Sequence, residues 1–347
     1  MVAGELPDFP YLPELPDRGP GADLTGRTAA LLVDLPVEVT PRGWRLAERP
    51  GRDLARARSM LSADLDVLEE VLQGYQGPVK IQLCGPWTLA ATLELTHTMN
   101  VALSDPGAVA DITASLAEAA TAHVADVAKR VPGARLVVQF DEPALPSVVA
   151  GAVPTASGLS RLAVVEDDTV QERLGQVLGA AHGYTVVHCC ATTVPFGIIR
   201  AAGADAVSFD LGQLRRGEED RVAESAEAGM GILAGAVQTA PVPAGRGPDS
   251  SRTNSGFTAP GQPDSSRGGG RNPGDGSDEA RQTAERVIRL WQRLGLPLAT
   301  CPDQAVVTPA CGLAGVSPAQ ARAALIRCRE AGSMLAELIE EIGGETS

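Results

Sequence analysis

The sequence predicts an α/β protein with the architecture of a (β/α)8 (TIM) barrel, and three observations support this. Short apolar runs alternate with longer Ala-rich stretches of helical period, which is the pattern of repeated βα units. The runs are continuously apolar, as in parallel strands that are buried on both faces. Several runs end in polar or reactive side chains, and barrel active sites are assembled at the carboxyl ends of several strands. A doubly wound sheet would instead gather its site at one switch point.

The strands and helices are expected in alternation along the chain. Strands are predicted at 79–85, 135–144, 184–190, 205–210, 231–239 and 304–312. Helices are predicted at 55–73, 106–131, 169–182, 280–295 and 318–342. The last helix should begin at Pro318, a residue favoured in a first helical turn, behind Ser317 as its N-cap.

Residues 244–279 interrupt this pattern, because Gly, Pro, Ser, Asp and Arg dominate there and PDSSR occurs twice. Such a segment cannot bury enough apolar surface to offset the entropy of ordering it. We therefore expect a disordered surface insertion within a single barrel domain that spans residues 1–347.

Composition excludes several classes of partner. The formal net charge is −14 over 347 residues, and no Lys/Arg cluster is present, so nucleic acid and anionic membranes are not expected partners. The N-terminus lacks the pattern of a signal peptide, and no apolar run approaches the ~20 residues of a membrane span. Six cysteines without a secretion signal indicate thiols or metal ligands rather than disulfides. We expect a cytoplasmic protein.

Four candidate metal ligands lie at predicted strand ends, namely His188, Cys190, Asp210 and Cys311. In TVVHCC (185–190), alternation along a strand points His188 and Cys190 to one side and Cys189 to the other. Zinc accepts such mixed nitrogen, sulfur and oxygen ligands. From this short stretch alone, a buried thiol pair in the core is the competing interpretation, because free cysteine is among the most buried residue types.

The stretch FDEPAL (140–145) places two carboxylates at another strand end. Asp141 can hold an amine or position a substrate there, or it can cap a helix next to Pro143, and the sequence does not separate the two roles. The remaining histidines, His97, His123 and His182, fall in helical stretches or near helix ends, where we expect them on the surface or partly buried.

The motifs VHCC, DAVSFD, QFDEPAL and TPACGLAG, in this order and spacing, resemble the catalytic domain of cobalamin-independent methionine synthase. They look closest to short members with a single barrel, in the superfamily that also contains uroporphyrinogen decarboxylase. The resemblance implies a Zn²⁺ site formed by His188, Cys190, Asp210 and Cys311. It also implies that a zinc-bound homocysteine thiolate accepts a methyl group to form methionine. Glu14 and Asp141 correspond to the ligands of the substrate's amino group.

The sequence departs from the family pattern in three places, and each changes what we expect of the site or the fold. The acidic zinc ligand of the long enzymes is Glu, and here it is Asp210. Gln238 stands where the long enzymes carry a histidine on the methyl-donor side, so donor activation should differ. The family's first strand ends in a G-S-x-P motif that this chain lacks, so we expect a barrel without its first strand. The methyl donor is left open between methyl-folate, a methyl-corrinoid and a donor protein.

Two other functions compete with this one. A non-catalytic or truncated zinc-binding relative would keep the ligands and lose turnover. A decarboxylase similar to uroporphyrinogen decarboxylase is disfavoured, because a substrate with many carboxylates calls for an Arg-rich cleft and this chain is acidic.

Overall fold

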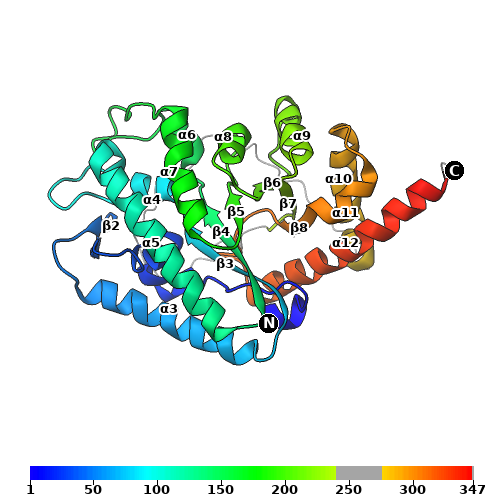
Figure 1. The fold of residues 1–347 in the computed structure, drawn as a ribbon, viewed down its shortest axis with the longest axis horizontal. Helices are drawn as coiled ribbons and strands as arrows, with labels where there is room; N and C mark the ends of the chain where they lie inside the picture. The colour runs from blue at the N-terminus through cyan, green and yellow to red at the C-terminus, as the bar shows by residue number, and fades with distance from the viewer. Residues whose placement is uncertain (240–275, 346–347) are drawn as a thin grey trace, which may run out of the picture.

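A computed structural model of the protein describes residues 1–239 and 276–345. Within these residues, the central sheet has six parallel strands in the order β3-β4-β5-β6-β7-β8, each paired with its neighbours in sequence. They are β3 (Gly77–Cys84), β4 (Ala134–Asp141), β5 (Tyr184–His188), β6 (Ala206–Asp210), β7 (Gly231–Val237) and β8 (Ala305–Pro309). All six predicted strands are confirmed, and the sheet curls into a half-barrel (Figure 1).

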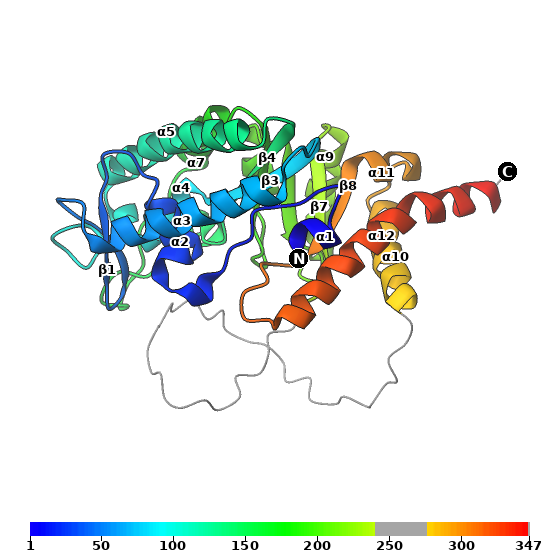
Figure 2. The same ribbon diagram turned by 90° about the horizontal axis from the view of Figure 1, so that it is seen from below.

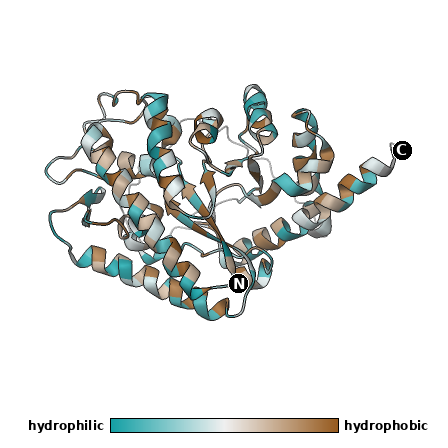
Figure 3. Cartoon of the chain, viewed as in Figure 1, coloured by the Kyte–Doolittle hydropathy of each residue, from teal (hydrophilic) through white to brown (hydrophobic). Residues whose placement is uncertain are grey.

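Helices cover the outer face of the sheet, and they carry both hydrophilic and hydrophobic residues, whereas the strands are mostly hydrophobic (Figure 3). The predicted helices correspond to α3 (Arg52–Val71), α5 (Pro106–Arg130), α7 (Asp167–Ala180), α10 (Gly276–Arg293) and α12 (Pro318–Glu345). Shorter helices are α1 (Val2–Glu5), α2 (Leu24–Ala29), α4 (Pro86–Thr92), α6 (Leu145–Val149), α8 (Phe196–Ala201), α9 (Glu219–Glu227) and α11 (Cys301–Gln304). Single 3-10 turns are η1 (Pro16–Arg18), η2 (Pro20–Ala22), η3 (Ala102–Ser104), η4 (Arg216–Glu218) and η5 (Leu298–Thr300). None of the described helices has an apolar stretch long enough to cross a bilayer.

Two helix starts can be compared with the sequence prediction. Helix α12 begins as expected, since the Ser317 hydroxyl accepts from the Gln320 backbone N–H at 3.3 Å and Gln320 Oε1 accepts from the Ser317 N–H at 2.9 Å. Helix α10 begins one turn earlier than predicted, with Asp278 and Glu279 in its first turn, where acidic residues are favoured. The predicted insertion therefore loses residues 276–279 to this helix, and its residues 244–275 lie outside the described part of the chain.

A β-hairpin that the sequence prediction missed precedes α3. Strands β1 (Val37–Thr40) and β2 (Gly43–Leu46) pair antiparallel and form a separate two-stranded sheet. Trp44 anchors it, being 4% exposed, with its indole N–H donating to the Pro20 carbonyl at 3.3 Å. The hairpin thus closes over η2 rather than extending the half-barrel.

The half-barrel is open on one side. The N-terminal segment adds a single parallel bridge to β3, with the Leu12 N–H donating to the Lys80 carbonyl at 2.9 Å and the Lys80 N–H to the Pro10 carbonyl at 3.0 Å. Among the described residues, no strand pairs with the outer edge of β8. Among the described residues the sheet is thus a partial barrel of six strands, and the predicted (β/α)8 barrel is confirmed only for this part.

Helices α1 and α12 lie along the open side, next to β8 (Figure 2). The Arg322 Nε donates to Glu5 Oε1 at 2.6 Å, and Arg329 Nη1 donates to the Glu5 carbonyl at 2.8 Å. These contacts fix the N-terminal helix against the last helix of the chain.

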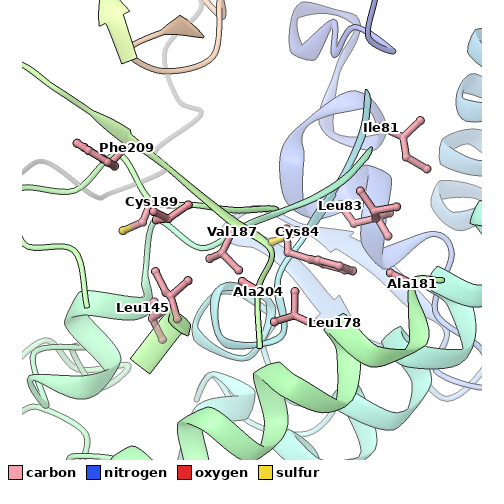
Figure 4. Close-up of a cluster of buried hydrophobic side chains, with 14 of the residues drawn as sticks. Ile81, Leu83, Cys84, Leu145, Leu178, Ala181, Val187, Cys189, Ala204 and Phe209 are labelled. Atoms are coloured by element: carbon pink, nitrogen blue, oxygen red, sulfur yellow. The ribbon is translucent and has the colours of Figure 1, made fainter. Parts of the chain in front are cut away.

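The main hydrophobic core lies between the sheet and the outer helices. Val187, Cys189 and Phe209 of the strand region face this side together with Leu145 and Leu178 (Figure 4). Cys189 is fully buried there, so the predicted outward orientation of this residue is confirmed.

A smaller apolar cluster lies on the inner face of the sheet. Its buried members are Val137, Val186, Ala206 and Leu233, and Phe9 packs against them. The first three each precede, by two positions on the same strand, a polar residue that lines the cavity described below. The inner face thus changes from apolar to polar toward the carboxyl ends of the strands.

His123 is the exception to the expected exposure of the histidines. It is 4% exposed within α5, where burial first and the positive charge of Arg27 second lower its pKa from 6.5 to about 4. The neutral imidazole is therefore the form that the folded protein favours.

This burial should make stability depend on pH. Between pH 6.5 and 4 the unfolded chain binds a proton at His123 that the folded chain does not, so stability should fall with falling pH, by about 3 kcal/mol in total from this residue. The His123→Leu variant should lose this part of the slope in urea unfolding followed across that range. Val127→Ala, a core change in the same helix, should lower stability equally at every pH. A slope unchanged by His123→Leu would refute the assignment.

Candidate metal and substrate site

A cavity of about 640 Å³ occupies the inner side of the half-barrel. Its polar wall is formed at the carboxyl ends of the strands and by the N-terminal segment. Polar side chains on this wall are Glu14, Lys80, Gln82, Gln139, Asp141, His188, Cys190, Ser208 and Cys311. Apolar residues such as Val306 of β8 and Leu325 of α12 also line the cavity, together with Arg329 of α12 and with Phe9 of the N-terminal segment. The cavity therefore offers both charged and apolar surfaces to a ligand.

Three of the four predicted metal ligands come together at the polar wall. The ligand atoms of His188, Cys190 and Cys311 all lie within 4.8 Å of one another. His188 ends β5 and Cys190 follows two positions later, while Cys311 follows β8, so the group joins two separate strands. The two sulfurs are 3.3 Å apart.

His188 is oriented by a neighbouring strand. Its Nδ1 and the Ser208 hydroxyl of β6 are 2.8 Å apart, and both side chains are buried. The register of β5 with β6 pairs these two residues directly. With Nδ1 engaged, Nε2 is the ring nitrogen left for a metal. Histidines that bind metals in proteins usually have their other ring nitrogen hydrogen-bonded in this way.

The two thiols are within hydrogen-bonding distance of each other. The hydrogen bond from Cys190 and a second one from His188 lower the pKa of Cys311, and the Cys311 sulfur raises the pKa of Cys190. Two sulfurs in contact beside an imidazole form a soft ligand set whose residue types fit a divalent zinc ion, which would bind the sulfurs as thiolates.

The fourth predicted ligand, Asp210, lies outside this group of three. Its carboxylate accepts from the Gly212 N–H at 2.8 Å, from Gln213 Nε2 at 2.9 Å and from Gln238 Nε2 at 3.0 Å. Gln213 Nε2 also reaches the Cys190 carbonyl at 3.1 Å. Asp210 and Gln238, which we predicted for different roles, therefore form one hydrogen-bonded cluster beside the thiols.

The two predicted substrate ligands, Glu14 and Asp141, both line the cavity. Asp141 is 7% exposed and accepts from Gln139 Nε2 at 2.6 Å, and burial raises its pKa. Burial first, and then the charge of Asp141, raises the pKa of Glu14 to about 7. The Oε1 atom of Glu14 is buried without a hydrogen-bond partner. Two carboxylates that repel each other across a cavity are a favourable setting for a cation.

The helix-capping role that was open for Asp141 belongs instead to the next residue, Glu142. The Glu142 carboxylate accepts from the backbone N–H groups of Trp87 and Thr88 at 2.9 and 2.8 Å, at the start of α4, and from the Thr88 hydroxyl at 2.7 Å. A Cβ at Gly85 would lie 2.3 Å from Glu142 Oε1, so glycine is required there. Asp141 is thus free to face the cavity.

The inward-facing polar residues of β3 were not predicted from the sequence. Lys80 and Gln82 alternate with Val79, Ile81 and Leu83 in a strand that was interpreted as continuously apolar. The polar residues at every second position were a usable signal, because side chains two apart on a strand share a face.

Comparison with known proteins supports the fold. No family model and no curated protein matches the chain. Among solved structures, the chain has the fold of a methionine synthase. One of the similar structures is a B12-independent methionine synthase from Shewanella sp. W3-18-1 in complex with selenomethionine. The TM-score is 0.51 at 13% sequence identity, and the match covers 88% of this chain and 76% of that one. At this identity the likeness establishes the shared fold.

Proposed function

We propose that this protein is a zinc-dependent methyltransferase that methylates the thiol of homocysteine to form methionine. The observation that carries the proposal is the convergence of His188, Cys190 and Cys311 at the mouth of a cavity whose walls include Glu14 and Asp141. The shared fold agrees with it, since the matching methionine synthase structure is a complex with selenomethionine.

The residues proposed to hold zinc are His188, Cys190 and Cys311, with Asp210 as the fourth ligand. Asp210 would exchange one of its present hydrogen bonds to Gln213 or Gln238 for the metal. With zinc bound, a substrate thiol can be held as a thiolate at neutral pH, which is the chemistry that the metal supplies.

The protein's own residues position the reactants. Ser208 holds the His188 ring in place through Nδ1. Glu14 and Asp141 receive the ammonium group of the amino acid, and binding of this cation favours their charged forms. Gln238, which is hydrogen-bonded to Asp210, is the residue that we assign to the methyl-donor side. A glutamine amide does not give up a proton near neutral pH, so Gln238 orients the donor and does not protonate its leaving group.

The test is methionine formation from homocysteine by the zinc-loaded protein, with methyl-folate and methylcobalamin offered separately. We expect methionine from one of these donors, and the donor that works identifies the class of cosubstrate. The Cys311→Ser variant should give only the background rate. A protein that binds zinc but forms no methionine with either donor, or with a cell extract as a source of donor proteins, would be a non-catalytic zinc protein.

A further inference from the structure

A lysine of the cavity wall has no role in the chemistry described so far. Lys80 lies on the inner face of β3, where its Nζ is 3.5 Å from Gln82 Oε1 and 5.2 Å from the centroid of the Tyr11 ring. Within the described part of the chain, Lys80 forms no ion pair, although Asp141 and Glu14 are the carboxylates whose charges act on it most. A cation withdrawn from water without an ion-pair partner is costly, and this is the expected state of a ligand-binding group before its ligand arrives.

The orientation of the Gln82 side-chain amide is set by a hydrogen bond to the backbone. Its Nε2 donates to the Leu12 carbonyl at 2.7 Å, so the amide oxygen is the atom that faces Lys80. The bond to Lys80 is at the long limit for a hydrogen bond. An ammonium group carries three N–H donors, so Lys80 keeps donors for a ligand in the cavity.

The two carboxylates whose charges act on Lys80 lie in the same cavity. Glu14 Oε1 is buried and has no hydrogen-bond partner, and the Asp141 carboxylate accepts from Gln139 Nε2 at 2.6 Å. The cavity therefore presents hydrogen-bond donors of positive charge and acceptors of negative charge within one wall. A free α-amino acid is the small molecule that carries the matching groups, an ammonium and a carboxylate on the same carbon.

We propose that Lys80 binds the α-carboxylate of the amino-acid substrate, while Glu14 and Asp141 bind its ammonium group. The inference rests on the proposed function insofar as it takes an amino acid as the ligand. It adds a residue that determines specificity, because the charge of Lys80 would select free amino acids over amines and thiols that lack the carboxylate.

The test compares two ligands by calorimetry on the zinc-loaded full chain. L-methionine carries the carboxylate, and L-methioninol has a hydroxymethyl group in its place and keeps the ammonium. The protein should bind methionine roughly 10- to 100-fold more tightly than methioninol, as expected for a charge-assisted hydrogen bond. Lys80→Met should bring the two affinities within about 3-fold of each other, because the charge-assisted hydrogen bond to the carboxylate is lost. Lys80→Arg should keep the preference.

Glu14→Gln serves as the matched control, because it removes the opposite charge of the same wall. It should weaken the binding of methionine and should not weaken the binding of 4-(methylthio)butanoate, which lacks the amine. A residue that only balances the charge of Glu14 and Asp141 would change all ligands alike when replaced.

The outcomes separate the two proposals. If Lys80→Met binds methionine and keeps the full preference for methionine over methioninol, the proposed role of Lys80 is wrong. The proposed function is unaffected by that result. Equal binding of methionine and methioninol by the unmodified protein leads to the same conclusion, and it needs no variant to fold. If the unmodified protein binds none of the three ligands, both proposals fail.

Discussion

Replacement of Cys311 by serine is expected to remove zinc from the protein. Cys311 supplies one of the two sulfurs that lie 3.3 Å apart, and it is the thiol whose pKa is lowered. Loss of a residue that hydrogen-bonds to a metal ligand already weakens metal binding by ~10–100-fold. Loss of a thiolate ligand itself should therefore weaken zinc binding by more than ~100-fold. Serine keeps the shape of the side chain but does not offer a thiolate.

The measurement is zinc per chain by elemental analysis after dialysis, with affinity from competition with a chromophoric chelator. The unmodified protein should retain about one zinc ion per chain, as a single four-ligand site requires. Cys301→Ala, which removes a buried thiol outside the cavity lining, should retain it as well. Asp210→Ala should weaken zinc binding less than Cys311→Ser, because Asp210 lies outside the group of three. Equal zinc content in Cys311→Ser and the unmodified protein would exclude this ligand set.

Replacement of Glu142 by alanine is expected to lower the free energy of unfolding by about 3 kcal/mol or more. The fully buried carboxylate accepts three hydrogen bonds, and two of their donors are backbone N–H groups in the first turn of α4. Alanine would leave Trp87 N–H, Thr88 N–H and the Thr88 hydroxyl without partners in a site closed to water. Each such buried donor costs about 1–3 kcal/mol.

Urea unfolding of the metal-free protein measures this loss without a contribution from zinc. The stability of Glu142→Gln should fall between those of the unmodified protein and Glu142→Ala. The glutamine amide oxygen keeps one acceptor, while its NH₂ group faces the N–H donors. Glu70→Ala, on an exposed position of α3, should change stability by less than about 0.5 kcal/mol. A Glu142→Ala variant as stable as this control would show that the hydrogen bonds to α4 contribute nothing net.

The sequence predicted the strands well because each contributes buried apolar residues to the core between the sheet and the outer helices, even where polar residues face the cavity, as in β3. It also predicted the orientation of His188, Cys189 and Cys190, since alternation along a strand is a local property. The approach of Cys311 to His188 and Cys190 depends on the curl of the sheet, and the resemblance to a known family supplied that part.

Other features depend on contacts that no local pattern contains. Asp141 and Glu142 are adjacent in the sequence, and either carboxylate suits a helix cap, but only the position of α4 decides which of them caps it. The hydrogen bonds of Asp210 to Gln213 and Gln238 likewise depend on how two loops meet. The start of α10 was misplaced because its first turn shares the polar composition of the preceding segment.

The placement of the two thiols couples metal affinity to folding. Cys190 and Cys311 are 121 residues apart in the chain, and they meet only when β5 and β8 belong to one sheet. An ion bound by both acts as a cross-link that the unfolded chain cannot offer at comparable affinity. By mass action, free zinc at 100 times its dissociation constant would add roughly 2.7 kcal/mol to the stability of the folded state. For a half-barrel with an open edge, the metal would thus be a structural clamp as well as a centre for chemistry.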